Sequence, residues 1–222
     1  MNKFILLQPE KAKAAIKILE DTYPNQKYYL DFSTPLELLV AAILSAQTRD
    51  VVVNSITPAL FNDYKTAKDY AGAGESDLLK YISKVTFAGN KVKNIIKACS
   101  MIEDDYDGKV PNSIESLVKL PGVGRKTANT VLINAYGIVE GIPVDTWVIK
   151  LASRIGLSKS QKPDEIERDL MGLVAKPYWK TIAYVLKAHG HKICHSARPL
   201  CSICVLNKLC PKNGVLKSTS LP

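Results

Sequence analysis

The stretch LPGVGRKTAN, Leu120–Asn129, places a proline and two glycines directly before an arginine and a lysine. Upstream, Asn112 and Glu115 have the spacing of a cap at the start of a short helix. Downstream, apolar residues recur at helical spacing, at Ala128, Val131, Leu132 and Ala135. The pattern therefore predicts two helices joined by a five-residue turn over about residues 113–133.

The turn has the features of a phosphate-binding loop. Gly122 and Gly124 allow positive φ angles and let another backbone approach closely. The N–H groups that open the second helix carry partial positive charge and bind anions. Main-chain donors read no base edge, so they would hold nucleic acid without sequence preference. An ordinary glycine turn is the alternative, but the basic pair Arg125 and Lys126 favours DNA.

The composition agrees with an intracellular protein that binds a polyanion. Thirty Lys and Arg against 21 Asp and Glu leave a net charge of +9 in 222 residues. A basic surface without a specific partner remains the alternative. No apolar run reaches the ~18 residues of a membrane span, and the apolar residues near the N-terminus are too few for a signal peptide. Five cysteines in a reducing compartment indicate metal ligands or core residues rather than disulfides.

Nearly every segment of the chain has helical periodicity. Residues 34–37, TPLE, combine an N-cap, a proline at the first helical position and a glutamate three residues after the cap. The following run, 36–46, is apolar on all sides and predicts a buried helix. Cys99 falls on the apolar face of a later helix, which predicts a core position. Only the β-branched run Val51–Val53 suggests a strand.

Lys126 is electrostatically misplaced, because a helix N-terminus carries partial positive charge. An amine of pKa about 10.4 is only ~0.04% neutral at pH 7, so an amine nucleophile requires a lowered pKa. The helix N-terminus, Arg125 and burial would all lower it. A lysine that pairs with a DNA phosphate is the alternative, and the physical argument leaves both roles open. Asp145 is first of all a plausible N-cap, and its carboxylate could also stabilise a developing sugar cation.

Four cysteines near the C-terminus have the spacing C-x6-C-x2-C-x5-C, which predicts a single metal site. Four thiolates suit zinc or a [4Fe-4S] cluster, and the spacing leaves both open. His189, His191 and His195 lie nearby, and we expect them to be surface or cap residues. The first cysteine loop is a second possible phosphate contact, because Lys192 lies two residues before its first cysteine and His195 and Arg198 lie between the first two. The ligands expected are Cys194, Cys201, Cys204 and Cys210.

These motifs in this order, together with DFSTPLELLVAAILSAQTRD at 31–50, resemble the endonuclease III family of DNA glycosylase/AP lyases. The resemblance covers almost the whole chain. It implies an all-α fold in which a six-helix barrel domain carries the helix-hairpin-helix and a discontinuous domain holds a [4Fe-4S] cluster. The expected boundaries are 28–138 for the barrel, with 1–27 and 139–222 forming the cluster domain.

The resemblance also implies residue roles. Lys126 would be the Schiff-base nucleophile, Asp145 the catalytic aspartate, and the four cysteines the cluster ligands. Gln47 would fill the gap left by a flipped nucleotide, and Phe87 would be an apolar wedge. The chain departs from the family pattern at several positions: Trp147 replaces a common His, Ser153 a common Asn, and Thr86 and Ala88 flank Phe87 where Gly and an aromatic are frequent.

The function implied is removal of oxidised pyrimidines from duplex DNA, followed by β-elimination that cleaves the strand 3′ to the abasic site. The expected partner is double-stranded DNA with damaged bases or abasic sites, bound by a monomer in a prokaryotic cytoplasm and associated with the nucleoid. Two rivals are a monofunctional glycosylase for another base and a non-enzymatic, cluster-bearing DNA-binding protein. Lys126 argues against both rivals.

Overall fold

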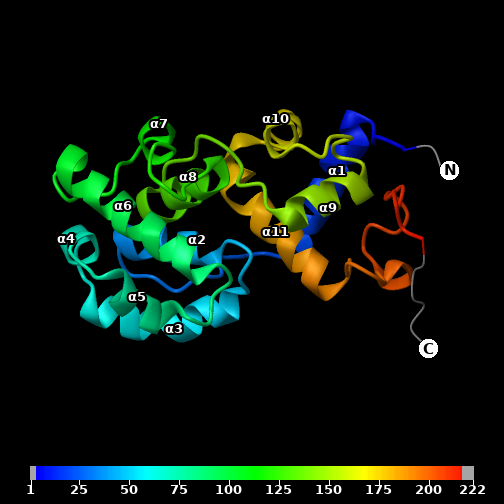
Figure 1. Cartoon of the computed structure of the whole chain (residues 1–222). Coiled ribbons are helices and arrows are strands. Elements are labelled where there is room, and N and C mark those ends of the chain that lie inside the picture. The colour runs from blue at the N-terminus through cyan, green and yellow to red at the C-terminus, as the bar shows by residue number, and fades with distance from the viewer. Residues whose placement is uncertain (1–3, 217–222) are drawn as a thin grey trace. The chain divides into compact units, whose positions relative to one another are not determined.

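The computed structural model describes residues 4–216, and none of these residues forms a β-strand (Figure 1). The all-α prediction is confirmed, and Val51–Val53 belongs to a helix rather than a strand. The chain divides into two compact units. One runs from Tyr29 to Glu140, and the other comprises residues 4–28 and 141–216. No helix within residues 4–216 is both long and apolar enough to cross a membrane.

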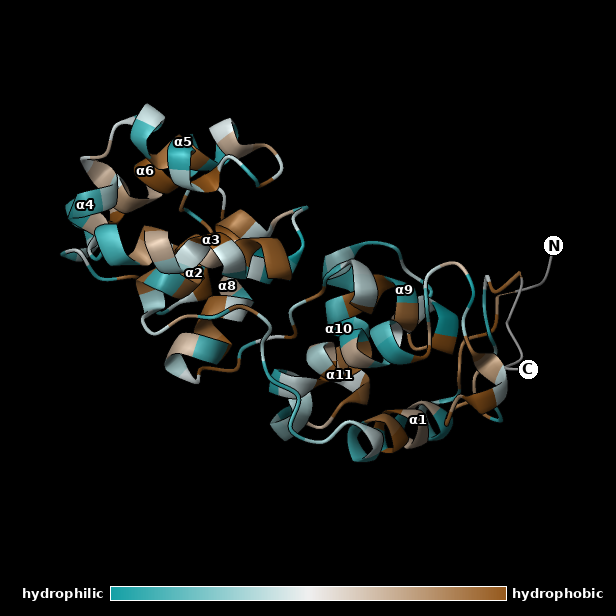
Figure 2. Cartoon of the chain, turned by 90° about the horizontal axis from the view of Figure 1, so that it is seen from below, coloured by the Kyte–Doolittle hydropathy of each residue, from teal (hydrophilic) through white to brown (hydrophobic). Residues whose placement is uncertain are grey.

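The unit from Tyr29 to Glu140 is built around one apolar helix. Its elements are α2 (Pro35–Ser45), α3 (Asp50–Asp63), α4 (Ala67–Ala71), α5 (Glu75–Ile82), α6 (Ala88–Tyr106), α7 (Ile114–Leu117), α8 (Arg125–Val131) and a π-helical turn, η1 (Leu132–Tyr136). Helix α2 packs against α3, α6 and α8, while α4 and α5 pack on α6. Figure 2 shows hydrophilic residues along α4 and, alternating with apolar ones, along α5.

The sequence of α2 explains both its start and its burial. The Thr34 hydroxyl accepts the Glu37 N–H at 3.2 Å, and the Glu37 carboxylate accepts the Ser33 N–H at 2.6 Å. Pro35 occupies the first turn, where a missing N–H costs nothing. Every residue from Leu38 to Leu44 is buried. A helix that is apolar all round requires neighbours on all sides, which places α2 at the centre of its unit.

The second unit contains α1 (Pro9–Thr22), α9 (Thr146–Ile155), α10 (Pro163–Leu173) and α11 (Trp179–Lys192), with 3₁₀ turns η2 (Lys176–Tyr178) and η3 (Cys201–Ile203). Helix α11 packs against α1 and α9, and α10 packs against the same two helices. The apolar stripe of α1 is buried at helical spacing, at Ala12, Ala15, Ile16 and Leu19.

The predicted hairpin is present, with one correction at its start. Ser113, not Asn112, caps α7, because its extended backbone lets its hydroxyl accept the N–H of Ser116 at 3.2 Å. Glu115 consequently makes no capping box and instead pairs with Lys119 at 3.6 Å. The helix that begins as α8 ends in η1, where Gly137 adopts a φ of 68° as the expected terminator.

Candidate active site and metal centre

The glycine turn between α7 and α8 depends on only one of its two glycines for its shape. Gly122 has a φ of +81°, and a Cβ there would lie 3.1 Å from the Asn94 side chain of α6. Gly124 has an extended conformation, with φ −92° and ψ 175°, so the expectation of positive φ is wrong at this position. A Cβ on Gly124 would meet nothing within 4 Å. Its lack of a side chain therefore leaves space outside the turn.

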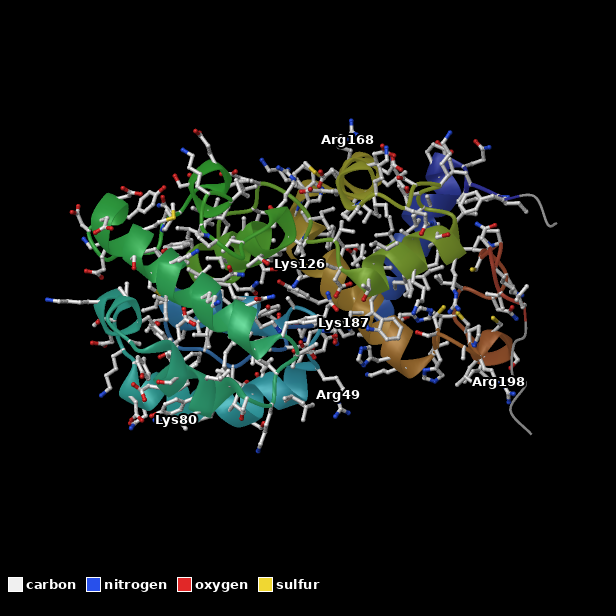
Figure 3. All side chains as sticks on the ribbon, in the orientation of Figure 1. Arg49, Lys80, Lys126, Arg168, Lys187 and Arg198 are labelled. Atoms are coloured by element: carbon white, nitrogen blue, oxygen red, sulfur yellow. The ribbon has the colours of Figure 1, made fainter. Side chains whose placement is uncertain are left out.

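Lys126 lies in the first turn of α8 and is half-buried, whereas Arg125 is exposed. Gly124 provides no side-chain cap for this helix, so its N-terminal dipole remains directed at the turn. The backbone at Lys126 is held in place by the packing of the rest of α8. Residues 128–131 are buried, and α8 packs on α2 and α7. Figure 3 shows the position of the Lys126 side chain at the start of α8.

Asp145 is the N-cap of α9, as the sequence predicted. Its Oδ1 accepts the N–H groups of Trp147 and Val148, both at 2.9 Å. No hydrogen bond from the described residues reaches Oδ2. One carboxylate oxygen therefore caps the helix while the other is available to a substrate, so the capping and chemical roles are compatible.

Trp147 fits against a glycine of α11. A Cβ on Gly190 would lie 2.4 Å from Cε3 of Trp147, so the indole occupies the space that any other residue there would fill. The Trp147 and His191 rings are 4.7 Å apart, and Lys150 Nζ lies 4.8 Å from the indole centroid. The departure from the family's histidine is thus accommodated by packing directly beside the cap at Asp145.

Gln47 and Phe87 lie in two loops of the unit from Tyr29 to Glu140, and both side chains are exposed. Each has a left-handed backbone, with φ values of 55° and 56°. Phe87 is 62% exposed, which is unusual for a phenylalanine and leaves its ring open to a partner. Val51, which is 80% exposed, follows Gln47 closely in sequence.

The four C-terminal cysteines line one pocket, whose empty space, including its opening to solvent, is about 370 Å³. Cys99 is not among its lining residues and is buried in the other unit, which confirms its predicted core position. Within residues 4–216, no group of three or more His, Cys, Asp or Glu side chains is arranged to hold a single metal ion. The four cysteines that line the pocket are Cys194, Cys201, Cys204 and Cys210.

Polar donors point at three of these sulfur atoms. Arg154 Nη1 lies 3.5 Å from Cys194 Sγ, and the backbone N–H groups of Leu206 and Lys212 lie 3.4 Å from Cys204 Sγ and Cys210 Sγ respectively. Donors of this kind stabilise cluster-bound thiolates and orient them. Burial raises the pKa of Cys194 and Cys204, and that of Cys210 to about 11. Four thiols around one pocket with aimed donors fit an iron-sulfur cluster.

Arg154 was not singled out from the sequence, although it holds the first cysteine loop. Its Nη1 donates to the carbonyls of Cys194 and His195, at 3.2 and 2.7 Å, and its Nη2 donates to the Ser196 carbonyl at 2.5 Å. Because Arg154 is in the last turn of α9 and Asp145 caps the first, one helix supports both the aspartate and the cysteine loop.

His189 was expected to be a surface or cap residue and is buried instead, at 1% exposure. Its Nε2 lies 3.6 Å from Cys204 Sγ, and its Nδ1 lies 3.0 Å from the Tyr23 hydroxyl. Burial lowers the pKa of His189 to about 4, so the ring is neutral at pH 7. A neutral ring has one donor nitrogen, so donation to the sulfur leaves Nδ1 to accept from Tyr23. His191 is exposed and His195 half-buried.

Lys192 and Arg198 are both exposed in the segment that carries the cysteines. Lys192 ends α11, and its Nζ lies 5.5 Å from the Tyr23 ring centroid. Arg198 lies on the loop between the first two cysteines (Figure 3).

Comparison with known proteins identifies the family. Residues 40–176 match the model of the HhH-GPD superfamily base excision DNA repair proteins. Endonuclease III of Synechocystis sp. is 45% identical over 91% of this chain and 92% of its own length. Endonuclease III of Bacillus subtilis is 38% identical over 96% of this chain and 100% of its own length.

A solved structure supports the same assignment. A trapped endonuclease III–DNA covalent intermediate aligns with a TM-score of 0.90 at 35% identity, and covers 93% of this chain and 97% of its own. The predicted resemblance and the helix-hairpin-helix fold class are thereby confirmed. The chain belongs to the HhH-GPD superfamily of base excision DNA repair proteins and, within it, to the endonuclease III family.

Proposed function

We propose that this protein is a base excision repair DNA glycosylase with AP lyase activity, and that it removes oxidised pyrimidines from duplex DNA. The observation that carries the proposal is the half-buried Lys126, held in the first turn of α8 directly after the glycine turn. The structurally similar endonuclease III was trapped as a covalent intermediate with DNA, and a covalent intermediate requires a nucleophile. A panel of duplexes, each with one oxidised or alkylated base, tests the substrate class.

In the proposed reaction the damaged nucleotide leaves the helix at a cost of a few kcal/mol, which a lesion reduces. The neutral amine of Lys126 attacks C1′ of the sugar, and the base departs as the C1′–N bond breaks. Oδ1 of Asp145 caps α9, and its Oδ2 offsets the positive charge that develops on the sugar. The sugar ring then opens as the C1′–O4′ bond breaks and O4′ takes a proton, which leaves a Schiff base between C1′ and Lys126. Loss of a C2′ proton from this Schiff base expels the 3′ phosphate, and hydrolysis releases the lysine.

The DNA contacts follow from the exposed loops. Gln47 fills the gap left by the extruded nucleotide, and the exposed ring of Phe87 wedges the neighbouring base step. The turn that contains Gly122 and Gly124 and is followed by Arg125 holds the phosphate backbone, for which the open space at Gly124 leaves room. Lys192 and Arg198 provide a second contact. The named relatives are bacterial proteins, and we infer that this chain acts as a monomer on the chromosome of a prokaryotic cell.

The four cysteines that line the pocket of the second unit would hold a [4Fe-4S] cluster. When bound, the cluster fixes the cysteine segment as a folded element, because metal binding free energy is folding free energy. Arg154 and the N–H groups of Leu206 and Lys212 orient the ligating sulfurs. Through Arg154, α9 connects this segment to the cap at Asp145.

Protein purified anaerobically should be brown and contain about four iron atoms per chain. Replacing Cys204 with alanine removes a proposed ligand, so iron content and visible absorbance should fall. Cys99→Ala is the matched control, because Cys99 lies in the other unit and outside the pocket. Iron analysis and absorbance spectra check the prediction. Stoichiometric zinc without iron, or iron loss from both variants alike, contradicts it.

Binding to undamaged duplex should be weak, independent of sequence and steeply dependent on salt. Each phosphate contact contributes about −0.9 to the slope of log K against log salt. Arg198→Gln should therefore reduce the slope by about 0.9. Lys80→Gln removes the same charge from an exposed ion pair with Asp77 at 2.7 Å, and should leave the slope unchanged. Fluorescence anisotropy over a range of salt concentrations measures the slope for each variant. Equal slopes for the two variants would show that Arg198 contacts no phosphate.

A further inference from the structure

Lys91 is a buried lysine that the proposed chemistry does not use. It is 5% exposed, although lysine is almost never buried without a partner. Its position is the first turn of α6, where the positive end of the helix dipole disfavours a cation. No carboxylate among the described residues pairs with it. Burial lowers the pKa of Lys91 accordingly.

The ammonium group of Lys91 instead holds the end of α2. Nζ donates to the carbonyl oxygens of Leu44 and Ala46, both at 2.6 Å. Leu44 lies in the last turn of α2 and Ala46 is its C-cap, where carbonyl acceptors lack intrahelical partners and the helix dipole is negative. A cation from α6 therefore caps the C-terminus of α2.

The third hydrogen bond of Lys91 joins this cap to a second loop. Nζ lies 3.0 Å from Thr48 Oγ1, and the same oxygen accepts the backbone N–H of Thr86 at 3.1 Å. The Lys91 N–H in turn donates to the Phe87 carbonyl at 3.2 Å. Lys91 and Thr48 thus connect the loop after α2 with the loop before α6.

Each connected loop contains one residue in the left-handed region. Gln47 lies between Ala46 and Thr48, and Phe87 follows Thr86. Such a backbone is strained for a residue with a side chain, and persists only where surrounding contacts determine it. Here the contacts that hold the two loops converge on Lys91, while the side chains of Gln47 and Phe87 remain exposed.

We propose that Lys91 is a positioning residue that holds Gln47 and Phe87 in the arrangement that enters DNA. The proposal rests on the proposed function of those two side chains as gap filler and wedge. Because Lys91 fixes both loops from one buried point, its loss should affect steps that require base extrusion and leave the chemistry at the sugar unchanged.

Lys91→Met in the full, cluster-loaded protein tests this. Methionine keeps a long apolar side chain and removes the three donors. Single-turnover excision from a duplex with a paired oxidised pyrimidine should fall about 10- to 100-fold, because a small misplacement of a positioning group has effects of that size. Cleavage of a single-stranded oligonucleotide with a preformed abasic site, which requires no extrusion, should stay at the wild-type rate.

Lys93→Met is the matched control, since Lys93 is exposed on the same helix and should behave as wild type on both substrates. A fluorescent 2-aminopurine placed opposite an abasic analogue reports insertion directly. Its fluorescence rise on binding should be lost in Lys91→Met and retained in Lys93→Met. In a Gln47→Ala/Phe87→Ala background, Lys91→Met should have no further effect, because coupled residues are non-additive.

Equal rate losses on both substrates, or full additivity with the double variant, would assign Lys91 a general structural role and overturn the proposal. If Lys91→Met does not fold, Thr48→Val decides, because it removes the link to Thr86 and leaves both bonds to the α2 carbonyls in place. An unimpaired Thr48→Val then overturns the proposal. Wild-type protein that cleaves neither substrate would refute the proposed function instead.

Discussion

Lys126→Gln should abolish strand cleavage at saturating enzyme, by at least about 1,000-fold, because glutamine has a polar side chain of similar length but no nucleophilic amine. Borohydride reduction of the wild-type reaction should trap a covalent protein–DNA adduct, and this adduct should be absent from the variant. Denaturing gels and single-turnover kinetics on duplex with one oxidised pyrimidine measure both effects.

Arg125→Gln is the matched control for Lys126→Gln. It removes one positive charge from the neighbouring position, where the side chain is exposed. Without the Arg125 guanidinium to pair with a phosphate, DNA binding should weaken, and cleavage should recover at high enzyme concentration. If Lys126→Gln recovers in the same way, or still gives the adduct at wild-type yield while folded and iron-loaded, Lys126 is a phosphate clamp and the nucleophile lies elsewhere.

The fold could be predicted wherever a local pattern determined it. The cap at Thr34 and the all-apolar run after it specify both the start of α2 and its central position. The predicted cap of α7 was wrong by one residue. Asn112 and Ser113 are both good caps, and only the backbone conformation selects between them. Element boundaries of this kind are not determined by side-chain type alone.

At the candidate site, the sequence predicted residue types better than their environments. The cysteine spacing located one pocket, but Arg154 binds a loop that begins forty residues later, which no local pattern reveals. His189 did leave a local signal, since it follows Leu186 by three residues on the buried stripe of α11. It was expected to be a surface or cap residue because the four cysteines complete the ligand set and leave no place for a histidine. Its burial against Tyr23 follows from the packing of α11 on α1.

Lys91 illustrates the limit of local patterns most clearly. It lies four residues before Ile95 on the apolar stripe of α6, where a lysine is out of place. The sequence therefore marks it as unusual. Its three acceptors come from residues 44–48 in another helix and loop, so its role follows only from tertiary structure. The left-handed backbones at Gln47 and Phe87 are likewise consequences of that tertiary arrangement.

Asp145→Asn should reduce base excision about 100- to 1,000-fold, the usual effect of removing one electrostatic stabiliser from a reaction centre. The structure makes this substitution selective. Asparagine caps helices as well as aspartate does, and its Oδ1 can accept the N–H groups of Trp147 and Val148 as the native Oδ1 does. The cap of α9 is therefore retained, and the variant lacks only the negative charge that offsets the developing sugar cation.

The same variant should retain much of its cleavage of DNA that already contains an abasic site, because the glycosidic bond is absent there and little positive charge has to be stabilised. Asp145→Ala separates the two roles of the carboxylate, since it removes the cap as well as the charge and should destabilise the protein by about 1 kcal/mol more. Thermal unfolding measures that difference, and single-turnover rates on lesion and abasic duplexes measure the rest. Should Asp145→Asn impair both substrates to the same extent, Asp145 acts on the lysine or on the abasic sugar rather than on departure of the base; should it impair neither, Asp145 is a helix cap alone.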